Sequence, residues 1–102
     1  MTYLTREQII SKLRANKASL REKFDVRAVG LFGSYSTGAH TDGSDIDIVY
    51  ELMEGRRLGL REIEALEAHF GELFHKRAVD LVDRRYVNPI VWSEIEKTAI
   101  YV

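Results

Sequence analysis

The 102-residue sequence contains no cysteine, a single proline and almost no net charge. The lack of cysteine excludes disulfide bonds and cysteine-ligated metal sites. With 15 basic and 16 acidic residues, no strong overall field draws the protein to nucleic acid or to a membrane surface. We therefore expect neither as a partner, and a long nucleic-acid groove of the polymerase kind is disfavoured without being excluded.

Long hydrophobic runs are also missing from the sequence. The apolar stretches are far shorter than the roughly 20 residues that are needed to span a bilayer. The first six residues lack the apolar centre of a signal peptide. We expect one cytoplasmic domain over residues 1–102, which is long enough to bury a single core.

Hydrophobic spacing predicts alternating helices and strands. Thr5 and Gln8 have the spacing of a capping box, and a helix of about five turns is expected to follow as far as Phe24. The other expected helical segments cover residues 34–38, 60–74 and 90–97. The expected strands cover residues 26–32, 45–52 and 77–82, with a short terminal strand or tail over 99–102. The predicted fold class is α+β, a small mixed sheet of three or more strands packed with helices.

Two short motifs carry the chemistry of this sequence. The first strand ends in Gly33-Ser34, and ten residues later the second begins with Asp45-Ile46-Asp47. Small residues in a turn let backbone N–H groups approach phosphate oxygens. Paired carboxylates hold hard divalent cations such as Mg²⁺. The segment therefore predicts a site for a nucleoside triphosphate that is carried by metal ions.

Strand geometry fixes how the two aspartates lie. Because side chains alternate between the faces of a strand, Asp45 and Asp47 share one face, and Ile46, Ile48 and Tyr50 share the other. Two carboxylates this close repel each other unless a positive charge lies between them, and a divalent cation is the simplest solution. The alternative is an ordinary solvated strand start. It is disfavoured because aspartate is depleted in strands and because a Gly-Ser turn comes before this pair.

Asp80 is the best candidate for a third carboxylate. It lies between Val79 and Leu81, which we expect to face the core helices, so Asp80 falls on the side of the aspartate pair. Asp83 lies at the strand end and out of register. A third carboxylate would complete a two-metal site, whereas the alternative for Asp80 is a solvent-facing residue on a half-exposed strand.

Taken together, these motifs resemble those of the minimal nucleotidyltransferases of the polymerase-beta-like superfamily. The matching segments are Gly33-Ser34, Ser44-Asp45-Ile46-Asp47 and Val79-Asp80-Leu81. Members of this group are commonly encoded beside a HEPN-domain protein as toxin–antitoxin pairs. The resemblance implies the polymerase-beta-like nucleotidyltransferase fold and the transfer of a nucleoside monophosphate from a triphosphate to an acceptor hydroxyl.

The resemblance also implies a role for each site residue. Gly33 and Ser34 would hold the β- and γ-phosphates, and Asp45 and Asp47 would bind the metals. Asp80 would complete the acceptor-side metal site and help to deprotonate the hydroxyl. The implied cofactor is Mg²⁺, as two ions, and the implied substrate is ATP or another nucleoside triphosphate. Two cations bridge the attacking and leaving oxygens, while the protein mainly positions the reacting groups.

For the MNT–HEPN pairs, the resemblance implies an antitoxin that adenylylates a tyrosine of its HEPN toxin. The expected partners are therefore a nucleoside triphosphate and a HEPN-domain protein. A non-catalytic antitoxin that blocks its partner by occupancy stays open. An antibiotic-modifying nucleotidyltransferase is a weaker alternative, because those enzymes carry an additional acceptor domain. Whether the chain forms an oligomer is also left open.

The sequence departs from the family pattern at Thr37, where many relatives carry an arginine. Thr37 supplies a hydroxyl but no charge, so we expect either a lower affinity for the triphosphate or a cation supplied by Arg56, Arg57 or a partner protein. Tyr35, inside the same motif, is expected either to stack on a base or to shield the turn. His69 is expected on the surface or at a helix end.

Overall fold

The computed structural model describes residues 4–102 of the chain. Its elements follow in the order α1 (Arg6–Phe24), β1 (Val26–Phe32), α2 (Gly33–Thr37), β2 (Ile46–Leu52), α3 (Leu60–Leu73), β3 (Val79–Asp83), a 3-10 turn (Arg84–Tyr86), α4 (Pro89–Thr98) and β4 (Ile100–Tyr101). The predicted order of helices and strands is confirmed, and the terminal segment forms a strand. Several boundaries differ by one or two residues; in particular, β2 begins one residue after Asp45, and β3 is shifted from the expected range 77–82.

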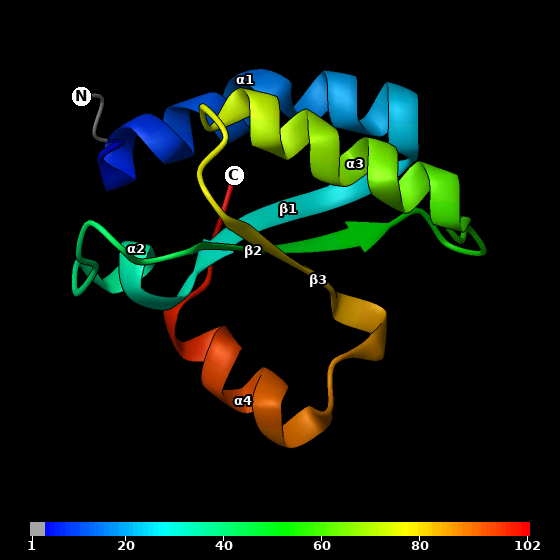
Figure 1. Ribbon diagram of the computed structural model, residues 1–102. Helices are drawn as coiled ribbons and strands as arrows, with labels where there is room; N and C mark the ends of the chain where they lie inside the picture. Colours follow the sequence, from blue (N-terminus) through cyan, green and yellow to red (C-terminus); the bar gives the residue numbers. More distant parts are fainter. Residues whose placement is uncertain (1–3) are drawn as a thin grey trace.

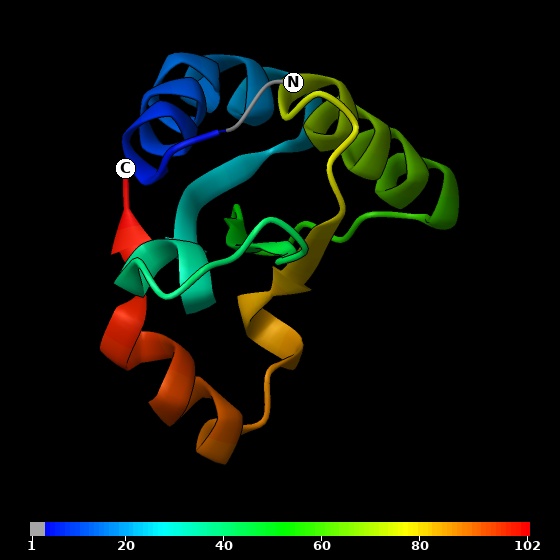
Figure 2. The same cartoon turned by 60° about the vertical axis from the view of Figure 1, so that its left-hand side comes forward.

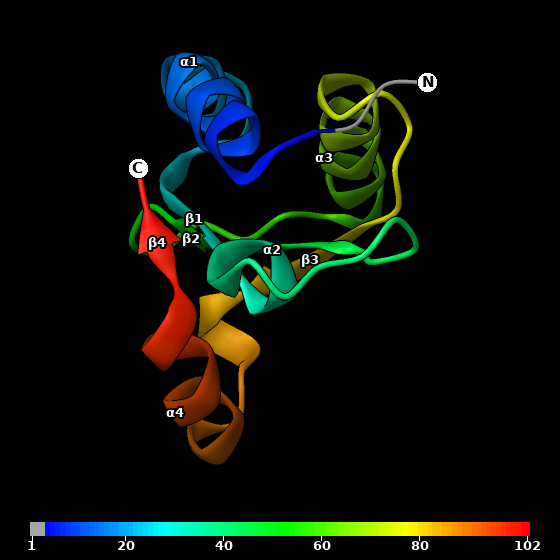
Figure 3. The same cartoon turned by 90° about the vertical axis from the view of Figure 1, so that its left-hand side faces the viewer.

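The four strands form one mixed sheet in the order β3-β2-β1-β4. Strand β1 pairs antiparallel with β2 and with β4, whereas β2 and β3 are parallel. A parallel pair needs a crossover connection, which α3 provides. Helices α1 and α3 cover one face of the sheet and α4 lies on the other (Figure 1). Figure 3, viewed toward the end of the sheet that carries α2, separates the same layers. The predicted α+β class is therefore confirmed.

The core lies between the sheet and helices α1 and α3. Ile46 and Ile48 are fully buried and Tyr50 is only 6% exposed, which confirms that this face of β2 is the core face. The largest fully buried side chains of the helices are Ile9, Leu13, Leu20, Leu66 and Phe70. Burial of these apolar groups supplies most of the driving force for folding. Asp47 lies on the opposite face of β2, where it is half-buried.

The start of α1 is fixed by the predicted capping box. The Thr5 hydroxyl accepts a hydrogen bond from the Gln8 N–H at 3.1 Å, and the Gln8 side chain accepts one from the Thr5 N–H at 2.9 Å. The next residue, Arg6, donates through its guanidinium to the Ser36 carbonyl at 3.0 Å. This hydrogen bond joins the first turn of α1 to α2.

Within residues 4–102, none of the helices is long and apolar enough to cross a membrane.

His69 corrects one expectation. Its ring is half-buried and lies edge-on to Phe24 and to Phe70, with 5.9 Å between ring centroids in each case. Burial, and then the nearby Lys23 charge, lower the pKa of His69. It is therefore a packing residue at the α1–α3 contact and not a surface residue.

Candidate active site

Strand register brings the predicted site residues to one end of the sheet. Asp47 pairs with Phe32, the last residue of β1, and on its other side with Asp80 of β3. Asp47 is half-buried, whereas Asp80 is exposed, and Asp45 is exposed just before β2 begins. Helix α2 and the loop that follows it lie at this end of the sheet (Figure 2). The structure thus places Asp47 between the Gly33 turn and Asp80.

Gly33 lies directly against the Asp47 carboxylate. A Cβ atom built on Gly33 would lie 2.2 Å from Asp47 Oδ2, and the φ angle of Gly33 is +73°. Only glycine adopts such a φ angle without strain, and only glycine leaves room for the carboxylate. The Gly33-Ser34 motif and the Asp45-Ile46-Asp47 motif are therefore in contact through Gly33 and Asp47.

The pKa of Asp47 reflects both its burial and the two carboxylates near it. Burial, followed by repulsion from Asp80 and then from Asp45, raises the pKa of Asp47 above the ordinary aspartate value. Each of the three predicted ligands thus takes part in the same repulsion. A divalent cation among these carboxylates would relieve it, since an opposite charge favours the ionised form.

The side chains as they stand do not form a complete metal site. In the stretch from residue 4 to residue 102, no group of three or more histidine, aspartate or glutamate side chains is arranged to hold a metal ion. Asp47 and Asp80 are neighbours through the sheet register, whereas Asp45 lies on the exposed segment that precedes the strand. The carboxylate chemistry and the shared repulsion fit a hard cation such as Mg²⁺. The three-ligand metal site itself stays a prediction.

The raised pKa leads to a prediction about stability. In metal-free buffer at pH 7, Asp47→Asn is expected to raise the melting temperature by a few degrees, because the ionised carboxylate is disfavoured in the folded state. As the pH falls through the raised folded pKa, Asp47 takes up a proton and this cost disappears, so the advantage of the variant shrinks. Melting curves from pH 7 to pH 4 measure the effect. Glu64→Gln, at an exposed position of α3, serves as the control, and equal shifts for both variants would contradict the prediction.

The turn that carries Ser34 is the short helix α2. Thr98, the last residue of α4, forms hydrogen bonds to this helix. The Gly33 N–H donates to the Thr98 hydroxyl at 3.3 Å. The hydroxyl of the buried Ser36 donates to the Thr98 carbonyl. Sequence reasoning did not single out Thr98, because a threonine at a helix end 65 residues from Gly33 carries no local signal.

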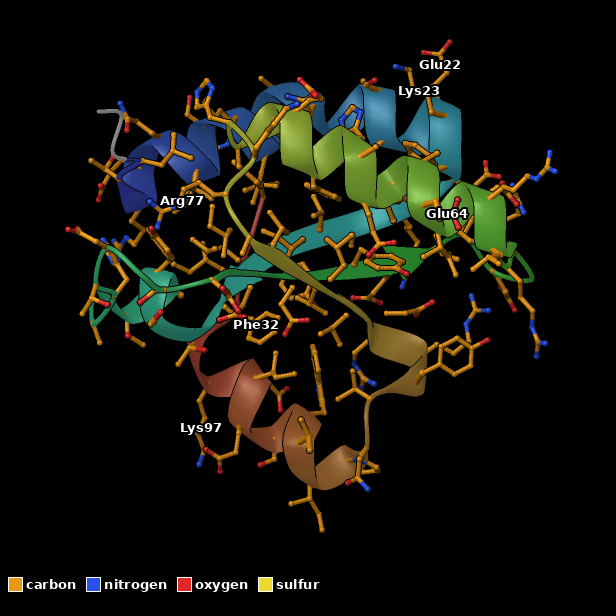
Figure 4. All side chains as sticks on the ribbon, viewed as in Figure 1. Glu22, Lys23, Phe32, Glu64, Arg77 and Lys97 are labelled. Atoms are coloured by element: carbon orange, nitrogen blue, oxygen red, sulfur yellow. The ribbon has the colours of Figure 1, made fainter. Side chains whose placement is uncertain are left out.

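Arg77 is a second residue that sequence reasoning missed. One of its guanidinium nitrogens, Nη2, donates to the Tyr35 hydroxyl at 2.9 Å and to the Asp42 carbonyl at 2.8 Å, with Ser44 O at 3.4 Å. Tyr35 is 2% exposed, and His40 stacks on it with ring centroids 4.0 Å apart. Tyr35 therefore shields the turn and is no platform for a base. Arg77, labelled in Figure 4, thus stabilises the loop between α2 and β2 through its hydrogen bonds to the Asp42 and Ser44 carbonyls.

Neither Arg56 nor Arg57 supplies the positive charge that is missing at Thr37. Arg56 forms ion pairs with Asp25 and with Glu62, each at 2.6 Å, and donates to the Arg57 carbonyl. These residues lie past the carboxyl end of β2, whereas the carboxylates lie at its amino end. The structure therefore excludes Arg56 and Arg57 as the source of this charge and leaves two alternatives, a lower triphosphate affinity and a cation from a partner protein. The exposed Thr37 itself donates its hydroxyl back to the Ser34 carbonyl at 3.3 Å.

A hollow of 460 Å³ opens beside Asp80 on the α4 side of the sheet. Its lining residues include Phe32, Val87, Val91 and Ile95. Figure 4 shows Phe32 between the sheet and α4. The candidate carboxylates are thus flanked by the Gly33 turn on one side and by a largely apolar hollow on the other.

Comparison with known proteins identifies the family and the fold of this chain. The nucleotidyltransferase domain family matches residues 13–102. The protein adenylyltransferase MntA of Thermococcus cleftensis is 39% identical over 102 residues, which cover all of both chains. A solved structure provisionally assigned as a minimal nucleotidyltransferase superposes with a TM-score of 0.78 at 25% identity and 98% coverage of both chains. A toxin–antitoxin crystal structure with AMP-PNP gives a TM-score of 0.66 at 26% identity, covering 96% of this chain and 72% of the other.

Proposed function

This chain belongs to the nucleotidyltransferase domain family and is a nucleotidyltransferase, and from that premise we propose that it transfers AMP from ATP to a hydroxyl of a partner protein. The single observation that carries the proposal is the contact between Gly33 and the Asp47 carboxylate, with Asp80 next to Asp47 in the sheet. This contact sets a glycine turn suited to phosphate against carboxylates suited to divalent metal.

Each site residue then has a role in the reaction. Gly33 and Ser34 would hold the β- and γ-phosphates, and Asp45 and Asp47 would hold Mg²⁺. Asp80, beside the hollow, receives the acceptor hydroxyl and helps to remove its proton as the oxygen attacks the α-phosphorus. Pyrophosphate leaves on the opposite side of that phosphorus. Bound Mg²⁺ supplies charge neutralisation at the phosphates. The chain itself contributes the alignment, which dominates catalysis of this type.

The proposed acceptor is a tyrosine of a HEPN toxin, so the protein acts as the antitoxin. The name of the Thermococcus cleftensis relative, a protein adenylyltransferase, supports a protein acceptor. The toxin–antitoxin assembly with AMP-PNP supports both a toxin partner and an adenine nucleotide. An apolar hollow beside Asp80 suits an aromatic side chain better than a charged one.

Thermal shifts with nucleotide and metal test whether the site binds its substrate. We expect ATP with Mg²⁺ to raise the melting temperature by several degrees, since a ligand at 100 times its Kd stabilises by about 2.7 kcal/mol. ATP with a chelator and Mg²⁺ alone serve as controls and should give smaller shifts. The absence of any shift with ATP, GTP, CTP or UTP would count against the proposal.

Inhibition by occupancy alone is the second candidate function. It is favoured by Thr37, whose hydroxyl is turned back onto Ser34 and which brings no charge to the phosphates. On this alternative the protein blocks its toxin without modifying it. The two functions differ in one outcome: an occupancy inhibitor keeps its full effect when the carboxylates are removed.

A further inference from the structure

Thr98, the last residue of α4, contacts α2 through two different groups. Its hydroxyl accepts a hydrogen bond from the Gly33 N–H at 3.3 Å, and its carbonyl accepts one from the Ser36 hydroxyl. Ser34, the residue proposed to bind phosphate, lies between these two held positions. Thr98 therefore forms hydrogen bonds to the turn on both sides of Ser34.

The orientation of the Thr98 hydroxyl is fixed by a third contact. Its proton is donated to the Ile95 carbonyl at 3.3 Å, which leaves an oxygen lone pair for the Gly33 N–H. Ile95 is only 7% exposed and anchors α4 against the rest of the protein. The hydroxyl thus acts as a fixed acceptor on a packed helix and not as a freely rotating group.

We propose that Thr98 is a positioning residue, which sets the α2 turn so that Ser34 and the Gly33 backbone are held in place against the Asp47 carboxylate. This inference rests on the proposed function, because it assigns the turn to phosphate binding. Groups that are held in place before the substrate arrives bind it at a lower entropic cost. Loss of the Thr98 hydroxyl should therefore weaken nucleotide binding more than it slows the chemical step.

The kinetic test compares Thr98→Val, which removes only the hydroxyl, with Thr98→Ser, which keeps it. In Mg²⁺-dependent AMP transfer, we expect Thr98→Val to raise KM for ATP by about five- to tenfold, the size expected for one neutral hydrogen bond, while kcat changes less than about threefold. Thr98→Ser should restore the wild-type KM. Ser93→Ala, at an exposed position of the same helix, is the control for general effects on α4.

Three kinetic results would overturn the proposal. An unchanged KM in Thr98→Val would show that the hydroxyl does not position the turn. A lower KM would show that the hydroxyl competes with phosphate for the Gly33 N–H instead of supporting its binding. An equal loss in Thr98→Val and Thr98→Ser would show that the hydroxyl is not the group that matters.

A measurement without nucleotide separates this inference from the proposed function. Amide hydrogen exchange at Gly33 should be faster in Thr98→Val than in the wild type, Thr98→Ser or Ser93→Ala, since only Thr98→Val leaves this N–H without its acceptor. Unchanged exchange at Gly33 would overturn the inference. If the wild type transfers no nucleotide, the proposed function fails and the exchange result alone decides the role of Thr98.

Discussion

Replacing Asp45 and Asp47 together by asparagine is expected to abolish nucleotide transfer while the protein stays folded. We expect a loss of at least about 100-fold, the size seen when groups that stabilise transition-state charge are removed. Asparagine keeps the side-chain shape and removes the negative charges that we propose to hold the metal. Burial, and then repulsion from Asp80 and Asp45, raises the pKa of Asp47. A neutral side chain carries neither cost, so the variant should be no less stable than the wild type. Initial rates of transfer of labelled AMP, with melting curves alongside, measure both effects.

A matched control removes two carboxylates elsewhere. Glu54→Gln with Glu64→Gln changes the net charge equally at exposed positions away from the site and should keep nearly full activity. A double aspartate variant that still transferred AMP at wild-type rate would refute the assigned roles. A variant that lost transfer but silenced the toxin as well as the wild type would establish inhibition by occupancy.

Gly33→Ala has the second largest expected effect, because it combines backbone strain with a clash. The φ angle of +73° costs a side-chain-bearing residue about 1–2 kcal/mol, which corresponds to a melting temperature lower by roughly 5–15 °C in a domain of this size. The new Cβ would also lie 2.2 Å from Asp47 Oδ2, so the carboxylate has to move. We therefore expect lower stability together with a loss of transfer of about 100-fold.

Gly38→Ala separates the two causes. Gly38 has a similar φ angle of +84°, but a Cβ built there meets nothing within 4 Å. This variant should lose stability to a similar degree and keep most of its activity. If both alanine variants lost activity equally at a temperature where both are folded, the contact between Gly33 and Asp47 would not be what matters for function.

Local patterns were enough to predict the frame of the site. The alternation along β2 placed Ile46 and Ile48 in the core and Asp47 on the opposite face, because strand period and burial are properties of one segment. The same reasoning placed Asp80 on the side of Asp47, and the parallel pairing of β2 with β3 puts the two residues next to each other. The start of β2 was misplaced by one residue, which left Asp45 outside the strand.

Contacts between distant segments could not be predicted in this way. Arg77 reaches the Tyr35 hydroxyl across 42 positions of the sequence, and nothing in the local pattern distinguishes it from a solvated arginine. Arg56 was offered as a source of positive charge at the phosphates, and the structure places it elsewhere. It follows the carboxyl end of β2 and forms ion pairs there with Asp25 and Glu62. Which end of a strand a loop reaches depends on chain direction, which a count of charges ignores.

Transfer of labelled AMP to a partner protein tests the central claim most directly. The wild-type protein is incubated with a co-encoded HEPN protein and each of the four labelled nucleoside triphosphates, with Mg²⁺ or with a chelator. We predict Mg²⁺-dependent label from ATP on a tyrosine of the partner, and none with the variant that lacks Asp45 and Asp47. No label on the partner from any of the four nucleotides, under conditions in which the toxin is nevertheless silenced, would contradict this account.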